Sequence, residues 1–254
     1  MDDKYNIPIL GKTFAIIEKV AGNPDGISFI NLVKSLNQPK TTIFRILYTL
    51  EKQNWIEKKG DLYFLGYMFI HYGLLTLSRR DLRNIARPYM QELSDTLQVT
   101  SHVAVMSGKH SMILEVFDTP HHIKPSSVAG ALLPLHCTSH GKILLAFAVK
   151  EPLETFLEDV EMEKKTENTI TTISALEKEV DNVRQCGYAM DNLEYFPDIR
   201  CLAAPLWGPE NECLGALGIT ATAVSFPENE IDRYAEIVMK TATAVSREMG
   251  ATIR

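Results

Sequence analysis

The stretch NQPKTTIFRILYTLEKQNW, residues 37–55, has the pattern of a helix with one apolar side. Ile43, Ile46, Leu47 and Leu50 recur at helical spacing, and Pro39 suits the first turn of such a helix. If these aliphatic residues face a core, a rotation of about 100° per residue turns the others outward or toward the flank. The residues turned away from the core are Lys40, Thr41, Thr42, Arg45, Tyr48, Thr49 and Lys52.

Two helices are expected before this one, and the second of them is short. Residues 8–21 carry an apolar repeat, and Asn-Pro-Asp-Gly at 23–26 then supplies a turn. Ser28 is a plausible N-cap for a second helix that would end at Asn37. The apolar residues of the first repeat are Leu10, Phe14, Ile17 and Ala21, and those of the second are Phe29, Val33 and Leu36.

The connection between the second and third helices is about two to four residues long, the length found in a helix-turn-helix. Residues 55–65 follow as two short strand patterns around Gly60-Asp61, which predicts a β-hairpin. Three helices followed by such a hairpin make the winged variant of the motif.

The outward residues of the third helix suit the major groove of DNA. Arg can bind guanine through two hydrogen bonds, Thr can contact phosphate or a thymine methyl, and Lys neutralises phosphate. We therefore expect contacts at or near the bases from Thr41, Thr42, Arg45 and Tyr48, and phosphate contacts from Ser28, Lys40, Lys58 and Lys59. The alternative is an amphipathic helix whose polar side is merely solvated.

Composition and length limit the class of protein. A chain of 254 residues with 45% hydrophobic and 23% charged residues is a folded protein, and its length favours two domains. Residues 1–66 hold nine Lys/Arg and seven Asp/Glu, whereas the whole chain has a formal net charge of -6. A slightly basic first unit joined to an acidic second one is expected when only the first meets a polyanion.

The cellular location follows from what the sequence lacks. The N-terminal residues have no apolar core of a secretory signal, and the longest apolar run, near residues 67–77, is too short for a membrane span. The four cysteines have no Cys-x-x-Cys spacing, so free thiols are expected. The sequence therefore predicts a cytoplasmic protein without a membrane partner.

Residues 66–77 are too apolar for a solvated linker and predict a buried helix. Such a helix, placed between two domains, could pack against its own copy in a homodimer or homotetramer, or only against its own chain. A further amphipathic helix follows from Leu82 to Leu97, and Pro88 is expected to break or restart it.

The rest of the chain alternates strand and helix patterns. Strands are expected at 102–106, 112–117, 201–207 and 214–221, and helices at 139–149, 174–186 and 228–249. The short connection at 107–110 joins the first two strands as a hairpin, so the sheet is at least partly antiparallel. The fold class is therefore α+β: a winged helix-turn-helix at 1–66, a connecting helix at 67–80 and a mainly antiparallel α/β domain at 81–254.

A binding site for an anion is possible where the 139–149 helix starts. Thr138 or Ser139 can cap it, Gly141 leaves its first amides open, and these amides with Lys142 could attract a carboxylate. The alternative is an N-capped core helix without a ligand. The acidic stretch at 190–201 is expected to be a loop ahead of a buried strand that could close over a ligand, with Thr220 on the next strand pointing to the same cavity. The alternative is a loop that is merely solvated.

Catalysis and metal binding have little support. His136, Cys137 and His140 offer ligand types for zinc or a thiol nucleophile, but their spacing matches no known finger. The chain has no G-x-S-x-G, H-E-x-x-H, P-loop or G-x-G-x-x-G sequence. No catalytic residue, metal or cofactor is expected.

Taken together, several motifs resemble the IclR-type bacterial transcriptional regulators, over nearly the whole chain. The resemblance rests on PKTTIFRILYTLEKQNWIE (39–57), DLRNIARPYMQEL (81–93), LPLHCTSHGK (133–142), GYAMDNLEY (187–195), IRCLAAPLW (199–207) and LGALGIT (214–220). It implies a winged helix-turn-helix, a dimerising helix and a GAF-like domain that binds a small, often carboxylate-bearing or aromatic, effector. Dimers and dimers of dimers are common in this family.

The resemblance also implies an effector site. By motif position, the residues that would line it are Ser139, His140, Gly141, Asp191, Cys201 and Thr220. His140, Leu193 and Asp198 depart from the family's usual residues near this site, so the effector's identity stays open. The expected function is a metabolite-responsive regulator of a double-stranded operator, either repressor or activator. Two alternatives are an enzyme with an accessory helix-turn-helix domain and a protein-interaction module.

Overall fold

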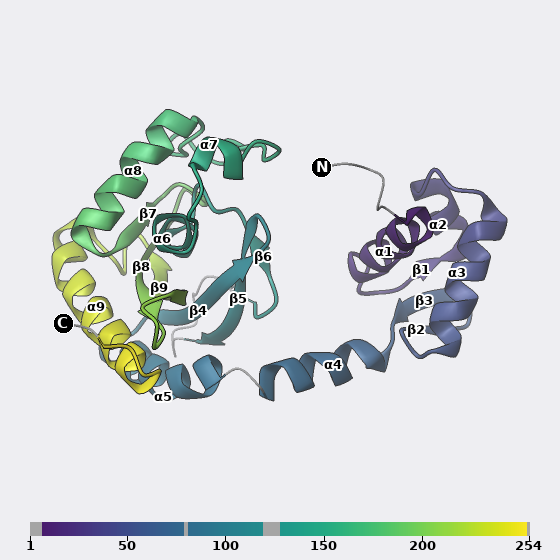
Figure 1. Cartoon of the computed structure of the whole chain (residues 1–254), viewed down its shortest axis with the longest axis horizontal. Helices are drawn as coiled ribbons and strands as arrows, with labels where there is room; N and C mark the ends of the chain where they lie inside the picture. The colour runs from purple at the N-terminus through teal and green to yellow at the C-terminus, as the bar shows by residue number, and fades with distance from the viewer. Residues whose placement is uncertain (1–6, 79–80, 119–127, 253–254) are drawn as a thin grey trace. The chain divides into compact units, whose positions relative to one another are not determined.

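The computed structural model of the chain describes residues 7–78, 81–118 and 128–252. The chain divides into two compact units, Met1–Arg79 and Arg80–Arg254. Each unit has its own β-sheet, visible in Figure 1, and its own buried apolar cluster.

The first unit is a winged helix-turn-helix. Its elements are α1 (Pro8–Ala21), β1 (Ile27–Ser28), α2 (Phe29–Ser35), α3 (Lys40–Lys52), β2 (Ile56–Lys59), β3 (Leu62–Leu65) and α4 (Tyr67–Ser78). Strands β2 and β3 form the expected hairpin, with Gly60 in the left-handed region at φ 60°. The two-residue strand β1 was not predicted, and it extends the hairpin into a sheet of order β1-β3-β2.

Helix α3 faces the core as its sequence predicts. Ile43, Ile46, Leu47 and Leu50 are its buried residues, and they join a cluster with α1, α2 and the hairpin. The four aliphatic positions therefore fix which side of α3 faces outward.

The helix expected at 8–21 is confirmed as α1, although its repeat does not mark the buried residues, and the expected end of α2 is wrong. The buried residues of α1 are Ile16 and Val20, whereas Phe14 is 60% exposed. Apolar residues lie on more than one side of α1, so their spacing alone does not select the packed side. Ser28 caps α2 as predicted, but the helix ends at Ser35, because Leu36 becomes extended and packs its side chain against the core.

The predicted helix after Gly66 is confirmed as α4. Gly66 lies so close to the preceding loop that a Cβ atom would stand 2.1 Å from the Asn54 carbonyl oxygen. Trp55 stacks on Tyr72 of α4, with the ring centroids 5.3 Å apart, and meets Phe69 edge-on at 5.0 Å. The start of α4 is thus anchored to the winged unit.

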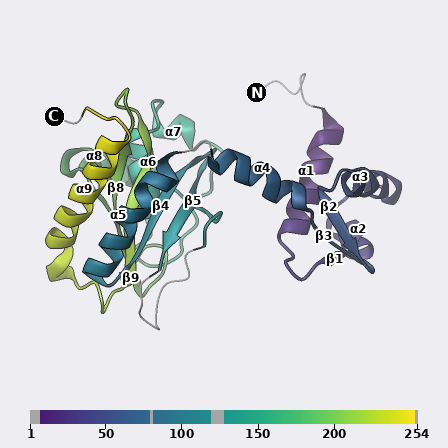
Figure 2. The same cartoon turned by 90° about the horizontal axis from the view of Figure 1, so that it is seen from below.

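The second unit is built on a curled antiparallel sheet of order β6-β5-β4-β9-β8-β7. Helix α6 lies on the concave side of the sheet, next to α8, and α5 and α9 pack together on its outer side (Figures 1 and 2). The elements are α5 (Asp81–Leu97), β4 (Thr100–Ser107), β5 (His110–Phe117), β6 (Leu132–Leu133), α6 (Ser139–Phe147), α7 (Leu153–Phe156), α8 (Ile173–Cys186), β7 (Ala189–Asn192), β8 (Ile199–Trp207), β9 (Cys213–Thr222), a 3-10 turn (Glu228–Glu230) and α9 (Ile231–Glu248).

Two expectations for this unit are corrected. Pro88 does not break α5, which runs through it to Leu97. Pro88 lacks one backbone donor, but Ala86, Met90 and Leu93 are buried on the inner side of the helix, and this packing offsets the lost hydrogen bond. Part of the acidic stretch at 190–201 is not a loop but strand β7, paired with β8.

Candidate functional site

The side of α3 that faces away from its buried residues carries exposed side chains. Lys40, Thr41, Arg45 and Tyr48 are exposed, as expected for groups that could contact DNA. Thr42 is half-buried and lines a groove between α1 and α3. Of the four residues expected near the bases, three are therefore exposed to solvent.

The residues expected at phosphates lie at the edges of the winged unit. Lys58 and Lys59 are exposed at the end of β2, and the Lys59 ammonium lies 3.0 Å from a Glu57 carboxylate oxygen. The Ser28 hydroxyl accepts a hydrogen bond from the Asn31 amide, at 3.2 Å. Within the described part of the chain its own proton has no acceptor, so it could donate to a phosphate oxygen.

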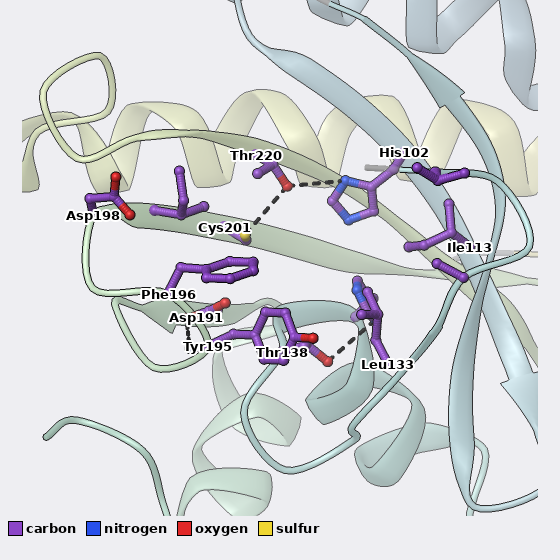
Figure 3. Close-up of a pocket in the computed structure, with 14 residues that line it drawn as sticks. His102, Ile113, Leu133, Thr138, Asp191, Tyr195, Phe196, Asp198, Cys201 and Thr220 are labelled. Carbon is purple, nitrogen blue, oxygen red and sulfur yellow. Dashed lines mark hydrogen bonds between the residues drawn. The ribbon is translucent and has the colours of Figure 1, made fainter. Parts of the chain in front are cut away.

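A cavity of about 350 Å³ opens into the second unit (Figure 3). Its floor comes from neighbouring strands, through Ile113 on β5, His102 on β4, Thr220 on β9 and Cys201 on β8. The start of α6 and the 191–199 segment supply its sides. The remaining lining residues are Val128, Ala131, Leu133, Thr138, His140, Asp191, Tyr195, Phe196, Asp198 and Ile199.

The cavity brings together four of the six residues expected to bind an effector: His140, Asp191, Cys201 and Thr220. Ser139 and Gly141 do not line it. Ser139 is completely buried, and a Cβ on Gly141 would lie 2.4 Å from the Leu135 carbonyl oxygen, so this glycine serves close packing of the helix start. Thr138 lines the cavity and caps α6, since its hydroxyl accepts from the Gly141 amide at 3.2 Å.

The sequence did not single out His102, which is the cavity's most notable polar group. Its Nδ1 lies 3.3 Å from the Thr220 hydroxyl, and its ring meets the ring of His140 edge-on, with centroids 5.3 Å apart. Burial lowers the pKa of His102 to about 4 and that of His140 well below its ordinary value, so both rings are neutral. No hydrogen bond to His102 Nε2 comes from the described residues. The available signal was a histidine at the start of the strand expected at 102–106, whose other residues are apolar.

Asp191 forms a tight turn at the side of the cavity. Its Oδ1 accepts hydrogen bonds from the amides of Glu194, at 2.7 Å, and Tyr195, at 3.2 Å. Leu193, inside this turn, adopts a left-handed conformation with φ 61°. Burial raises the pKa of the Asp191 carboxyl to about 7, against the effect of these amides. Asp191 can therefore carry a proton near neutral pH.

The expectation that Lys142 helps to attract an anion is wrong. Its side chain is 1% exposed and does not line the cavity. The ammonium donates to Glu194 at 2.7 Å, to Glu179 at 3.1 Å and to the Met190 carbonyl at 2.9 Å. A cation with these partners is already neutralised, because a buried charge is stable only when it is paired and hydrogen-bonded.

Among the amides at the start of α6, that of His140 belongs to a residue that lines the cavity, whereas Ser139 does not line it. The amides of Gly141 and Lys142 are bonded to Thr138, whereas those of Ser139 and His140 have no hydrogen-bond partner within the described part of the chain. Free amides at a helix N-terminus attract anionic groups. No Lys or Arg lines the cavity in the regions that the structure covers.

Cys137, Cys201 and His136 do not support nucleophilic chemistry. Burial raises the pKa of Cys137 to about 12 and that of Cys201 well above its ordinary value, so both are thiols at neutral pH. His136 is committed to the Glu163 carbonyl, at 3.2 Å. The described residues contain no group of three His, Cys, Asp or Glu that could hold a metal ion.

A winged helix-turn-helix joined to a unit with a polar-lined cavity defines the class of ligand-responsive DNA-binding regulators. The chain matches the family models of the bacterial transcriptional regulator IclR C-terminal domain, at residues 74–247, and the IclR helix-turn-helix domain, at residues 10–60. It belongs to the IclR family of transcriptional regulators, and not to a family of enzymes, which sets aside the enzyme alternative.

Relatives and solved structures agree with this assignment. The transcriptional regulator KdgR of Escherichia coli is 28% identical over 241 residues, which cover 94% of this chain and 91% of KdgR. XynR of the same organism is 26% identical over 226 residues, covering 88% of this chain and 90% of XynR. The crystal structure of Thermotoga maritima IclR has 27% identity and a TM-score of 0.73, and covers 96% of this chain and 100% of that one.

A second solved structure shares the fold at lower identity. An IclR transcriptional regulator from Silicibacter has a TM-score of 0.84 at 20% identity, and covers 97% of this chain and 98% of that one. Among the described residues, no helix has the length and apolar character needed to cross a bilayer.

Proposed function

We propose that the chain is a cytoplasmic, homo-oligomeric regulator whose affinity for a double-stranded operator changes when a small organic molecule occupies the cavity of its second unit. The observation that carries this proposal is the cavity of about 350 Å³, with buried polar groups on its walls, in a chain whose first unit is a DNA-binding fold. A cavity of this volume matches the size of metabolite sites. The proposed divisions are 1–66 for DNA, 67–80 for connection and 81–254 for the effector.

The effector we propose carries a carboxylate. The amide of His140 is suited to its oxygens, and a protonated Asp191 could donate a hydrogen bond to it. The apolar walls, which include Ile113 and Leu133, suit a short carbon skeleton. Because the described lining lacks Lys and Arg, we expect a monoanion rather than a dianion.

The DNA contacts follow from the exposure of the winged unit. Thr41, Thr42, Arg45 and Tyr48 are proposed at or near base edges in the major groove. Lys40, Lys58, Lys59 and Ser28 are proposed at phosphates, where they fix the position of the helix without reading sequence.

Oligomerisation is proposed to bring two such units to one operator. Tyr67, Ile70 and Leu74 of α4 are 71%, 57% and 60% exposed, which is unusual for three large apolar residues on one short helix. Packing against the same helix of a second chain would bury them, as a dimer or within a tetramer. Effector binding would then change the spacing of the two α3 helices and so repress or activate a gene.

A thermal-shift screen of small organic acids on the full chain tests the effector part. An acid that binds only the folded chain raises its melting temperature with concentration, by mass action. Failure of every acid, alongside a shift from neutral or cationic compounds, would overturn the carboxylate assignment. A ligand shift abolished in Asp191→Ala would support the cavity as its site.

Salt titration of DNA binding separates this proposal from a protein-interaction module. The logarithm of DNA affinity should fall linearly with the logarithm of salt concentration, because phosphate contacts release counterions. Binding of a protein partner, without measurable affinity for duplex DNA in dilute salt, would favour the module instead.

A further inference from the structure

Phe44 is the residue on the outer side of α3 that its amphipathic pattern does not explain. Its side chain is 56% exposed, whereas the four aliphatic residues of this helix are buried: Ile43, Ile46, Leu47 and Leu50. With a rotation of about 100° per residue, Thr41 lies opposite the core side of the helix. Around the helix axis, Phe44 lies about 60° from Thr41, whereas Lys40 and Thr42 each lie about 100° from Thr41. Phe44 is thus nearer to the centre of the outward face than either of them.

The ring is held in place although it is exposed. It meets the Phe29 ring edge-on, with centroids 6.4 Å apart and an interplanar angle of 88°. Phe29 is the first residue of α2 and packs partly into the core of the unit. A ring held in this way loses little further freedom when it makes a contact, which favours binding.

The groups around Phe44 indicate its partner. Arg45 and Tyr48 share the outward face, and Lys40 and Lys52 add two further cations to α3. A second copy of this face would bring like charges together, so an apolar contact between two α3 helices is disfavoured. A polyanion that also presents an apolar group would match both the cations of this face and the exposed Phe44 ring.

DNA offers one apolar group in the major groove, the C5 methyl of thymine. We propose that Phe44 is a specificity-determining residue that packs its ring against a thymine methyl in the operator, beside the base pair contacted by Arg45. This inference rests on the proposed role of α3 in the major groove. It adds to that role an aromatic contact with thymine, separate from those that the methyl groups of Thr41 and Thr42 could make.

The experiment compares thymine with uracil, which differs only by lacking the methyl group. A preferred duplex is first selected from random sequences with the full wild-type chain. Each thymine is then replaced singly by uracil, and affinities are measured for wild type, Phe44→Ala, Phe44→Leu and Phe14→Ala. Phe14 is a matched control, because it is a 60% exposed phenylalanine of the same unit that lies on α1.

We expect one uracil replacement to weaken binding of wild type and Phe14→Ala about fourfold, the effect of losing one methyl contact. The same replacement should leave Phe44→Ala unaffected, and Phe44→Leu should retain part of the effect. Equal uracil effects in wild type and Phe44→Ala, or no effect at any thymine, would overturn the role of Phe44 while leaving DNA binding by α3 intact. Failure to select any preferred duplex would overturn the DNA proposal itself.

Discussion

Replacing Asp191 with Asn should stabilise the second unit at neutral and higher pH and leave it almost unchanged near pH 4. Burial raises the pKa of the Asp191 carboxyl from 3.8 to about 7. Between these two values the folded state holds a proton that the unfolded chain has released, so the free energy of unfolding falls as the pH rises. At about 1.4 kcal/mol per pH unit, the full effect is about 4 kcal/mol above pH 7.

Asn is a suitable replacement because it cannot ionise and keeps a side-chain oxygen. That oxygen can still accept hydrogen bonds from the amides of Glu194 and Tyr195, as Asp191 Oδ1 does at 2.7 and 3.2 Å. The turn that borders the cavity should therefore persist in the variant. His102 and His140 titrate in both proteins, so their contribution largely cancels in the difference.

The assay is urea unfolding of the full chain at several pH values, followed by tryptophan fluorescence. The chain has two tryptophans, Trp55 in the first unit and Trp207 in the second. A Trp55→Phe background therefore reports on the second unit alone. Asp198→Asn, at an exposed carboxylate on the rim of the same cavity, is the matched control and should change little. Stability curves of wild type and Asp191→Asn that stay parallel from about pH 4 to about pH 8 would refute the reasoning.

Four further substitutions test other parts of the structure. Arg45→Ala should weaken binding to the selected duplex by about 1–3 kcal/mol and relax preference at one base pair; an equal loss on random-sequence DNA would contradict a base contact. Lys58→Ala should reduce the slope of log affinity against log salt by about 1 and leave the preferred sequence unchanged. Lys142→Met should lower the free energy of unfolding by about 3–5 kcal/mol in the Trp207 assay, since it leaves the buried Glu194 carboxylate unpaired; a near-neutral effect would mean that this carboxyl becomes protonated. His140→Ala should alter effector affinity in calorimetry, and an unchanged affinity would remove His140 from the binding site.

The sequence predicted best the elements whose apolar residues lie on a single side. The buried residues of α3 are those that its spacing indicated, and the β2–β3 hairpin turns at the expected Gly60-Asp61. Helix α1 was less predictable, because its apolar residues surround it and only contact with the neighbouring helices decides which are buried. A two-residue strand such as β1 has no period, and its existence depends on pairing with β3.

Long-range contacts explain what the sequence did not reveal about the cavity. Thr220 and His102 meet although they are 118 residues apart, and no local pattern at either position indicates the other. The character of Lys142 depends in the same way on Glu179 and Glu194, which lie 37 and 52 residues further along the chain. A lysine in the first turn of a helix suggests an exposed cation until its acidic partners are known.

The walls of the cavity differ in how freely they can change during evolution. His102, Cys201 and Thr220 lie on paired strands, and the Thr220 hydroxyl is hydrogen-bonded to both of the others, so a substitution at these positions would break a buried polar contact. Tyr195, Phe196 and Asp198 belong instead to the connection between β7 and β8, where a substitution alters the rim without breaking strand pairing. New ligand preferences can therefore arise by exchanging residues of this connection, while the scaffold beneath stays constant.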